Sequence, residues 1–203
     1  MGAGPPGMRY EGARWRLDLP LPSLPGAHQI DNAGTAIACL EQLNGISLSP
    51  AAIAAGLRHI EWPARLQRLS HGPLVAILPS GWELWLDGGH NPSAGQALGA
   101  FIATERDRPL DLIVGMLNTK DAAGFLAPLA RQARSLHAVT IPGEENPLPA
   151  EAITAAAASV GISAAAAPSI ASALSDIIRS AKPGRVLICG SLHLAGIVLA
   201  ENG

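Results

Sequence analysis

The strongest constraint on the fold is a regular alternation, from Trp82 onward, between short apolar runs and longer stretches with helical spacing. The apolar runs are "WELWLD", "LDLIVGML", "LHAVTI" and "RVLICG". Strands that are apolar on both faces need cover on both faces, and parallel strands joined by helices obtain it. The alternation therefore predicts an α/β fold with a doubly wound, mostly parallel, Rossmann-like sheet over residues 62–203.

Helix signals fill the connecting stretches of this region. Asn91 can cap a helix whose first residue is Pro92. Further helical patterns cover residues 120–133, 148–161, 169–181 and 194–200. Residues 65–69 and 74–78 have short β-like patterns that add strands ahead of these units. Ligands of such sheets bind beyond the carboxyl ends of the strands, and Asp87 stands at such an end.

Residues 1–61 contain too few elements for a domain of their own. Residues 1–12 are rich in glycine and proline and are expected to form a frayed lead-in without a site. An edge strand and a proline-rich loop follow. We then expect a helix capped by Asp31 or Asn32, and a second, short helix with Ser49 as its N-cap.

Composition narrows the choice of partners. Fourteen basic and 16 acidic residues give a net charge of -2, which provides no basic surface for nucleic acid and no polybasic patch for membranes. Small molecules are the expected partners. Cys39 and Cys189 are far apart and form no CxxC pair, a pattern typical of a reducing compartment. No apolar run approaches the roughly 18 residues of a membrane span, so we expect a cytoplasmic chain.

Several catalytic motifs are absent from the sequence. No P-loop motif and no GxGxxG turn between a strand and a helix is present. The six histidines are scattered and no paired cysteine ligands accompany them, so we expect no intrinsic metal site. Ser191 and His193 lack the flanking glycines of a nucleophile elbow and lie too close in sequence for a nucleophile and its base. Hydrolysis is therefore disfavoured.

Two residues, Asp87 at a strand end and Arg65 after a proline, could belong to a site or have only a local role. Asp87 could accept hydrogen bonds from a ribose, as acidic residues at strand ends do in nucleotide folds, or it could cap the next turn. Arg65 follows Trp62-Pro63, whose proline restricts the backbone, and could clamp a phosphate. The alternative for Arg65 is an exposed arginine without a ligand.

Three further positions leave similar alternatives open. Asn32 could form paired hydrogen bonds with an adenine edge, or it could serve only as a helix cap. His90 could contact a phosphate at a helix N-terminus, or it could be an ordinary loop histidine. The pair Lys120-Asp121, after the strand "LIVGML", is either part of a site or a solvated helix start.

Taken together, these pieces resemble the carboxyl-terminal part of folylpolyglutamate synthase and dihydrofolate synthase, members of the Mur ligase superfamily. The matching stretches are "LPGAHQIDNAGTAIACL", "WPARLQRL", "LDGGHNPSAG", "IVGMLNTKD" and "ICGSLHLAG", in that order over about residues 19–203. The resemblance implies an ATP-dependent, ADP-forming ligase of folate biosynthesis and one-carbon metabolism. A carboxylate of dihydropteroate or folate becomes an acyl phosphate, which the amine of L-glutamate then attacks.

The resemblance also implies roles for particular residues. Asn32 would bind the adenine of ATP, Arg65 would reach its phosphates, and Asp87 would bind its ribose. His90 would lie near the phosphates or the incoming glutamate, as the one catalytic candidate. The family's P-loop, Mg²⁺ ligands and modified lysine belong to an amino-terminal part, of which residues 1–61 resemble only the last elements of the central ATPase domain.

Departures from the family pattern are mild. Gly89 stands where alanine is usual, Ala64 where glycine is usual, and His193 where an aromatic residue is common. On this interpretation the chain is a truncated ligase, inactive alone, that closes over a nucleotide held by a missing amino-terminal ligase portion. Two alternatives remain: a noncatalytic nucleotide-binding or regulatory domain of the same fold, and the carboxyl-terminal domain of a cell-wall Mur ligase.

Overall fold

The computed structural model describes residues 7–45, 47–105 and 107–202. The chain divides into two compact units, Met1–Pro63 and Ala64–Gly203. This division falls two residues after the predicted boundary, and each unit is described by itself below. Within the described residues, no helix combines the length and the apolar character that a membrane crossing requires.

The first unit is a β-hairpin with two helices. Its elements are β1 (Gly7–Glu11), β2 (Arg16–Pro20), α1 (His28–Glu41) and α2 (Pro50–Arg58), and the two strands are antiparallel. The expectation of a frayed lead-in is wrong for β1. Met8 and Tyr10 alternate with exposed residues and pack into the small core of this unit, which gives the strand a buried face.

The start of α1 also differs from the expectation. The helix begins at His28 with Ala27 as its N-cap, so neither Asp31 nor Asn32 caps it. Gly26, at a φ of 105°, turns the chain into the helix before the polar pair is reached. The second helix agrees with the sequence, because the Ser49 side chain accepts a hydrogen bond from the backbone N–H of Ala52.

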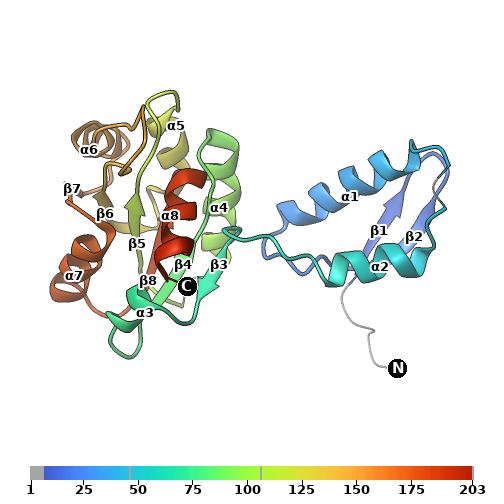
Figure 1. The fold of residues 1–203 in the computed structure, drawn as a ribbon, viewed down its shortest axis with the longest axis horizontal. Coiled ribbons are helices and arrows are strands. Elements are labelled where there is room, and N and C mark those ends of the chain that lie inside the picture. Colours follow the sequence, from blue (N-terminus) through green and yellow to red (C-terminus); the bar gives the residue numbers. More distant parts are fainter. Residues whose placement is uncertain (1–6, 46, 106, 203) are drawn as a thin grey trace. The chain divides into compact units, whose positions relative to one another are not determined.

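The second unit contains a six-stranded, mostly parallel sheet (Figure 1), which confirms the predicted fold class. The strand order is β3-β4-β8-β5-β6-β7, and only β3 is antiparallel to its neighbour. The strands are β3 (Gln67–Leu69), β4 (Glu83–Leu86), β5 (Leu110–Val114), β6 (Ala133–Ala138), β7 (Ala164–Ala166) and β8 (Arg185–Cys189). The last strand in sequence therefore inserts between β4 and β5.

Helices connect these strands and cover both faces of the sheet (Figure 1). They are α3 (Pro73–Ala76), α4 (Pro92–Thr104), α5 (Ala122–Leu126), α6 (Ala150–Ser159), α7 (Ile170–Ser180) and α8 (Leu192–Asn202). Residues 74–78 were predicted as a strand and instead contain α3, because Gly72 at a φ of 97° and Pro73 start a helical turn. The helix predicted over 120–133 is shorter, since it passes at Ala127–Leu129, which contains Pro128, into a 3₁₀ turn.

Alternating strand residues divide the core of the second unit into two layers. Leu112 and Val114 face α4, α5 and α6, whereas Ile113 between them packs with residues of α7 and α8. Because both layers are apolar, β5 and β8 are buried along their whole length. This packing fixes the strand ends, from which the candidate site is built.

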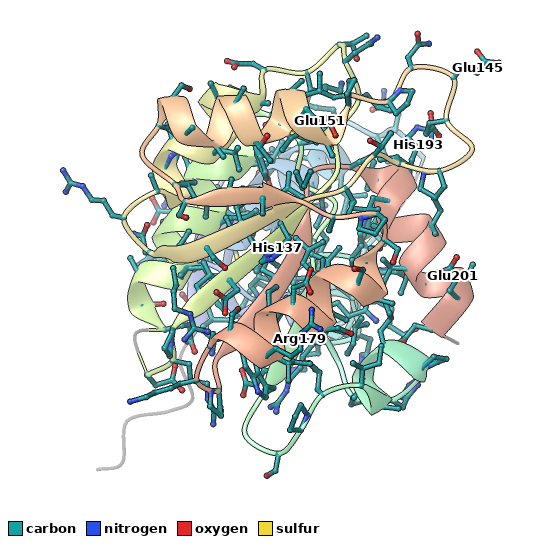
Figure 2. The ribbon with its side chains drawn as sticks, turned by 90° about the vertical axis from the view of Figure 1, so that its left-hand side faces the viewer. His137, Glu145, Glu151, Arg179, His193 and Glu201 are labelled. Atoms are coloured by element: carbon teal, nitrogen blue, oxygen red, sulfur yellow. The ribbon has the colours of Figure 1, made fainter. Side chains whose placement is uncertain are left out.

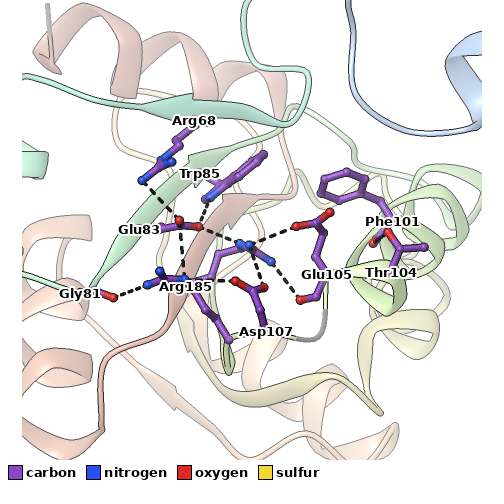
Figure 3. A network of polar contacts seen from close by, with 10 residues as sticks. Arg68, Gly81, Glu83, Trp85, Phe101, Thr104, Glu105, Asp107 and Arg185 are labelled. Atoms are coloured by element: carbon purple, nitrogen blue, oxygen red, sulfur yellow. Dashed lines mark hydrogen bonds and ion pairs between the residues drawn. The ribbon is translucent and has the colours of Figure 1, made fainter. Parts of the chain in front are cut away.

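The amino-terminal ends of the strands carry an ion network (Figure 3). The Arg185 guanidinium, whose side chain is 4% exposed, lies 3.2 Å from a Glu83 carboxylate oxygen, and Arg68 and Arg108 pair with the same carboxylate. Burial raises the pKa of Glu83, but hydrogen bonds from Trp85 and the arginine charges outweigh it and lower the pKa below its usual value. The network therefore closes the edge of the sheet opposite the candidate site.

Candidate functional site

The carboxyl ends of three neighbouring strands, β4, β8 and β5, meet at one edge of the sheet. A cavity of about 190 Å³ lies there, and its polar lining comes from His90, Lys120, Ser191 and His193. Each strand contributes the loop that follows it. The site thus occupies the position where doubly wound sheets bind ligands, beside a strand that inserts out of sequence order.

His90 follows β4 and is oriented by its own loop. Its Nδ1 lies 2.9 Å from the carbonyl oxygen of Gly88. A carbonyl oxygen only accepts hydrogen bonds, so Nδ1 carries the hydrogen, and Nε2 is the nitrogen that can serve a ligand. Asn91 caps α4 as predicted, since its side chain accepts a hydrogen bond from the Ala94 backbone N–H at 2.9 Å.

The end of β8 brings Ser191 and His193 to the cavity. Gly190 adopts a φ of 105°, and a Cβ there would lie 2.7 Å from the carbonyl oxygen of Gly115. Ser191 is 3% exposed, and its Oγ accepts a hydrogen bond from the His193 backbone N–H at 3.1 Å. The serine therefore lies at the start of α8, where its side chain accepts a backbone hydrogen bond.

The His193 ring makes its ion pair elsewhere. Its Nδ1 contacts the Glu144 carboxylate, from the loop between β6 and α6. Figure 2 shows His193 at the start of α8, close to the loop that carries Glu145. Sequence reasoning did not find Glu144, because no spacing rule links that loop to the end of β8.

The pair Lys120-Asp121 has two separate roles. Asp121 caps α5, with its Oδ1 accepting a hydrogen bond from the Gly124 backbone N–H at 2.8 Å. Lys120 lines the cavity, to which it brings a full positive charge. Of the alternatives that the sequence left open, Asp121 is a helix start, and a role of Lys120 in a site stays a prediction.

Asp87 is 5% exposed and its carboxylate is tied to the backbone. Its Oδ1 accepts a hydrogen bond from the Gly89 N–H at 2.7 Å, and its Oδ2 accepts one from the Leu66 N–H at 2.9 Å. The first bond is the turn-capping contact weighed in the sequence. Burial and the nearby Asp87 charge also raise the pKa of the Cys189 thiol well above its usual value.

Arg65 lies in the segment between the two residues with unusual backbone. Ala64 has a φ of 55° and Leu66 a φ of 46°, and both are 3% exposed. A left-handed conformation costs a residue other than glycine about 1–2 kcal/mol, so this segment is strained on both sides of Arg65. The value at Ala64 also accounts physically for the glycine that is usual in the family at this position.

The structure brings together some of the predicted residues. Arg65, Asp87 and His90 belong to the second unit, at or beside the carboxyl end of β4. Asn32 belongs to the first unit, where it is exposed on α1 and its Nδ2 donates to Gln29 Oε1 at 3.0 Å. Across the part of the chain that the structure describes, no group of three or more His, Cys, Asp or Glu side chains could hold a metal ion.

The fold and this edge of the sheet define a doubly wound α/β domain with a polar cavity beyond the carboxyl ends of β4, β5 and β8. Residues 76–201 match the family model for dihydrofolate synthetase, C-terminal domain. The chain belongs to this dihydrofolate and folylpolyglutamate synthase family and corresponds to its carboxyl-terminal region.

Relatives and solved structures agree with this membership. The dihydrofolate synthase/folylpolyglutamate synthase of Mycobacterium tuberculosis is 35% identical over 145 residues, which is 69% of this chain and 28% of that protein. The bifunctional folylpolyglutamate synthase/dihydrofolate synthase of Yersinia pestis CO92 superposes with a TM-score of 0.73 at 28% identity, over 95% of this chain and 43% of that one. A bifunctional enzyme of the same kind, solved with Mn, AMPPNP and L-glutamate bound, gives 0.74 at 28% identity over 94% and 43%.

Proposed function

We propose that the chain is the nucleotide-closing portion of an ATP-dependent ligase that joins L-glutamate to a folate-type carboxylate. The observation that carries the proposal is the cavity where His90, Lys120 and His193 meet, because the Lys120 ammonium is a charged hydrogen-bond donor that suits a carboxylate or a phosphate. The chain spans less than half the length of the relatives that it matches. The complete ligase reaction is therefore proposed for this chain together with an amino-terminal portion.

The reaction consists of two balanced steps. A carboxylate oxygen of dihydropteroate or folate attacks the γ-phosphorus of ATP, and ADP leaves. The amine nitrogen of glutamate then attacks the acyl carbon, phosphate leaves with the bonding electron pair, and the nitrogen loses a proton. Both steps develop negative charge on phosphate oxygens, which fixed cations stabilise in a site that excludes water.

We assign a separate role in this reaction to each candidate residue. Arg65 binds the phosphates, and Lys120 with His90 binds an anionic group in the cavity. The family resemblance supports Asn32 as the adenine contact and Asp87 as the ribose contact. A solved relative holds a nucleotide analogue and L-glutamate together with Mn, which supports ligands of these classes.

The Mg²⁺ that the resemblance implies does not fit this edge. The described residues that line the cavity include Lys120 and no carboxylate, and both Asp87 oxygens accept backbone hydrogen bonds. The sequence also lacks a P-loop. We therefore place the metal ligands and the tight triphosphate site on an amino-terminal ligase portion, and expect the present chain to be inactive alone.

The test is reconstitution. This chain is combined with a separately expressed amino-terminal portion of the Mycobacterium relative, and ADP release is measured with dihydropteroate or folate and L-glutamate. Substrate-dependent release by the mixture alone supports the proposal. Lys120→Met is expected to lower this substrate-dependent ADP release, whereas Lys182→Met, at the only other lysine and an exposed one, is expected to leave it unchanged.

Calorimetry with Mg-ATP separates the alternatives. Weak binding by this chain that becomes tight in the mixture supports a shared ligase site. Tight binding by the chain alone, without ADP release in the mixture, favours a noncatalytic nucleotide-binding or regulatory domain. Release with a muramoyl substrate in place of folate would indicate a cell-wall ligase, a class that the folate relatives disfavour.

A further inference from the structure

The segment from Ala64 to Leu66 passes twice through left-handed backbone without a glycine at either position. Leu66 is a bulky residue, for which a positive φ is a genuine outlier. Strain of this kind persists only where the surrounding contacts over-determine the backbone, and it gathers at functional sites. The contacts that stabilise this strained backbone therefore bear on the function of the segment.

Three hydrogen bonds hold it, and each comes from a different residue. Gln67 Oε1 accepts from the Ala64 backbone N–H at 2.8 Å, and the Ala64 carbonyl oxygen accepts from the Gly88 N–H at 2.9 Å. Asp87 Oδ2 accepts from the Leu66 N–H at 2.9 Å. The backbone is thereby fastened immediately before and immediately after Arg65.

Arg65 is the residue that this arrangement presents. Its neighbours Ala64 and Leu66 are buried, whereas Arg65 is half-buried. Among the described arginines of the second unit, Arg65 and Arg131 form no ion pair, whereas arginines 68, 108, 134, 179 and 185 all form one. An anchored arginine without an internal carboxylate partner is suited to an external anion.

We propose that Gln67 is a positioning residue for Arg65: its side chain holds Ala64 in the left-handed conformation that directs the guanidinium at a phosphorylated ligand. The nature of that ligand rests on the proposed function. In the described residues, the Gln67 side chain makes no other hydrogen bond, so its contact with Ala64 is its contribution to the segment.

The chemistry of the contact selects the variants. Glutamate has a side-chain oxygen at the same position, so Gln67→Glu keeps the hydrogen bond from the Ala64 N–H. Methionine has a similar length but is at best a weak acceptor, so Gln67→Met loses this hydrogen bond. Gln96→Met, on the exposed face of α4, is the matched control.

The first measurement is a double-mutant cycle on Mg-ATP affinity, in the mixture with the amino-terminal ligase portion. Gln67→Met is expected to weaken binding about tenfold in the parent and less than twofold in the Arg65→Ala background, because both changes remove one interaction. Gln67→Glu is expected to restore parental affinity. Equal losses in the two backgrounds, or no loss at all, would overturn the role of Gln67.

The second measurement needs no ligand and separates this inference from the proposed function. Amide hydrogen exchange of this chain alone is expected to be at least tenfold faster at Ala64 in Gln67→Met, with Ile113 in the core unchanged. If Mg-ATP does not bind to the mixture but the Ala64 amide exchanges faster in Gln67→Met, the nucleotide proposal fails and the positioning of Arg65 stands. If the Ala64 exchange rate does not change, the positioning role fails.

Discussion

The Asp87 carboxylate holds the backbone of Leu66, 21 residues earlier in the chain, with 2.9 Å between Oδ2 and the amide nitrogen. The second carboxylate oxygen holds the Gly89 N–H. One buried side chain thereby joins the loop after β4 to the strained segment before β3. The contact gives Asp87 a structural role beside any contact with a ribose.

The first prediction concerns the stability that this contact provides. Asp87→Asn leaves one N–H facing an amide group that cannot accept it, and a buried unsatisfied group costs about 1–3 kcal/mol. We expect Asp87→Asn to lower the free energy of unfolding by that amount in urea denaturation. Asp121→Asn is the control, because asparagine caps a helix as well as aspartate does. Equal stability of the two variants would contradict the structural role of Asp87.

The second prediction concerns the packing of α4. A Cβ on Gly95 would lie 2.2 Å from the carbonyl oxygen of Phe125, so Gly95→Ala forces α4 away from α5. We expect a loss of about 3 kcal/mol or more in unfolding free energy. Gly196→Ala on α8 meets open space and should instead add about 0.5–1 kcal/mol. Thermal unfolding of both variants measures the contrast, and a stabilised Gly95→Ala would show that the helices are not in contact there.

The third prediction concerns pH. The folded pKa of Glu83 is lowered below its reference value of 4.5, so its ionised form stabilises the fold above about that pH, and the contribution is lost as the pH falls further. Glu83→Gln is expected to be less stable than the parent at pH 7, and the difference should shrink from pH 5 to pH 3. Urea denaturation across this range, with exposed Glu151→Gln as control, tests the sign. A difference that grows on acidification would refute it.

The fourth prediction concerns thiol reactivity. Cys39 is exposed and Cys189 is buried, with a raised thiol pKa. Because the thiolate is the reactive form, a disulfide reagent should modify one thiol rapidly in the native chain and a second thiol only on unfolding. Cys39→Ser should remove the fast phase. A rapid reaction that persists in this variant would mean that the end of β8 opens in the native state.

Much of the second unit could be predicted because its signals are local. Apolar runs between helical patterns identify β4, β5 and β8, and the Asn91-Pro92 pair identifies the start of α4. The Ser49-Pro50 pair does the same for α2 in the first unit. These features depend on residues next to one another in sequence. The errors occurred where one residue changes the direction of the backbone, as Gly26 does before α1 and Gly72 does before α3.

The candidate site was only partly predictable for a related reason. Arg65, Asp87 and His90 could be selected because each lies beside a recognisable strand end or turn. The contacts of Gln67 with Ala64 and of Glu144 with His193 depend on backbone conformation and on a distant loop. Neither has a spacing signature in a single sequence. The sequence thus allowed candidate side chains to be selected, but it missed the residues that contact their neighbours in the fold.

The hydrogen bonds on both sides of Arg65 lie close to the division between the two units, which falls after Pro63. Arg65 is only two positions beyond that junction, yet Gln67, Asp87 and Gly88, which hold its neighbours, all belong to the second unit. The Arg65 backbone therefore cannot be displaced without breaking hydrogen bonds inside the second unit. In sequence the residue adjoins the junction, but the backbone on both sides of it is bonded within the second unit.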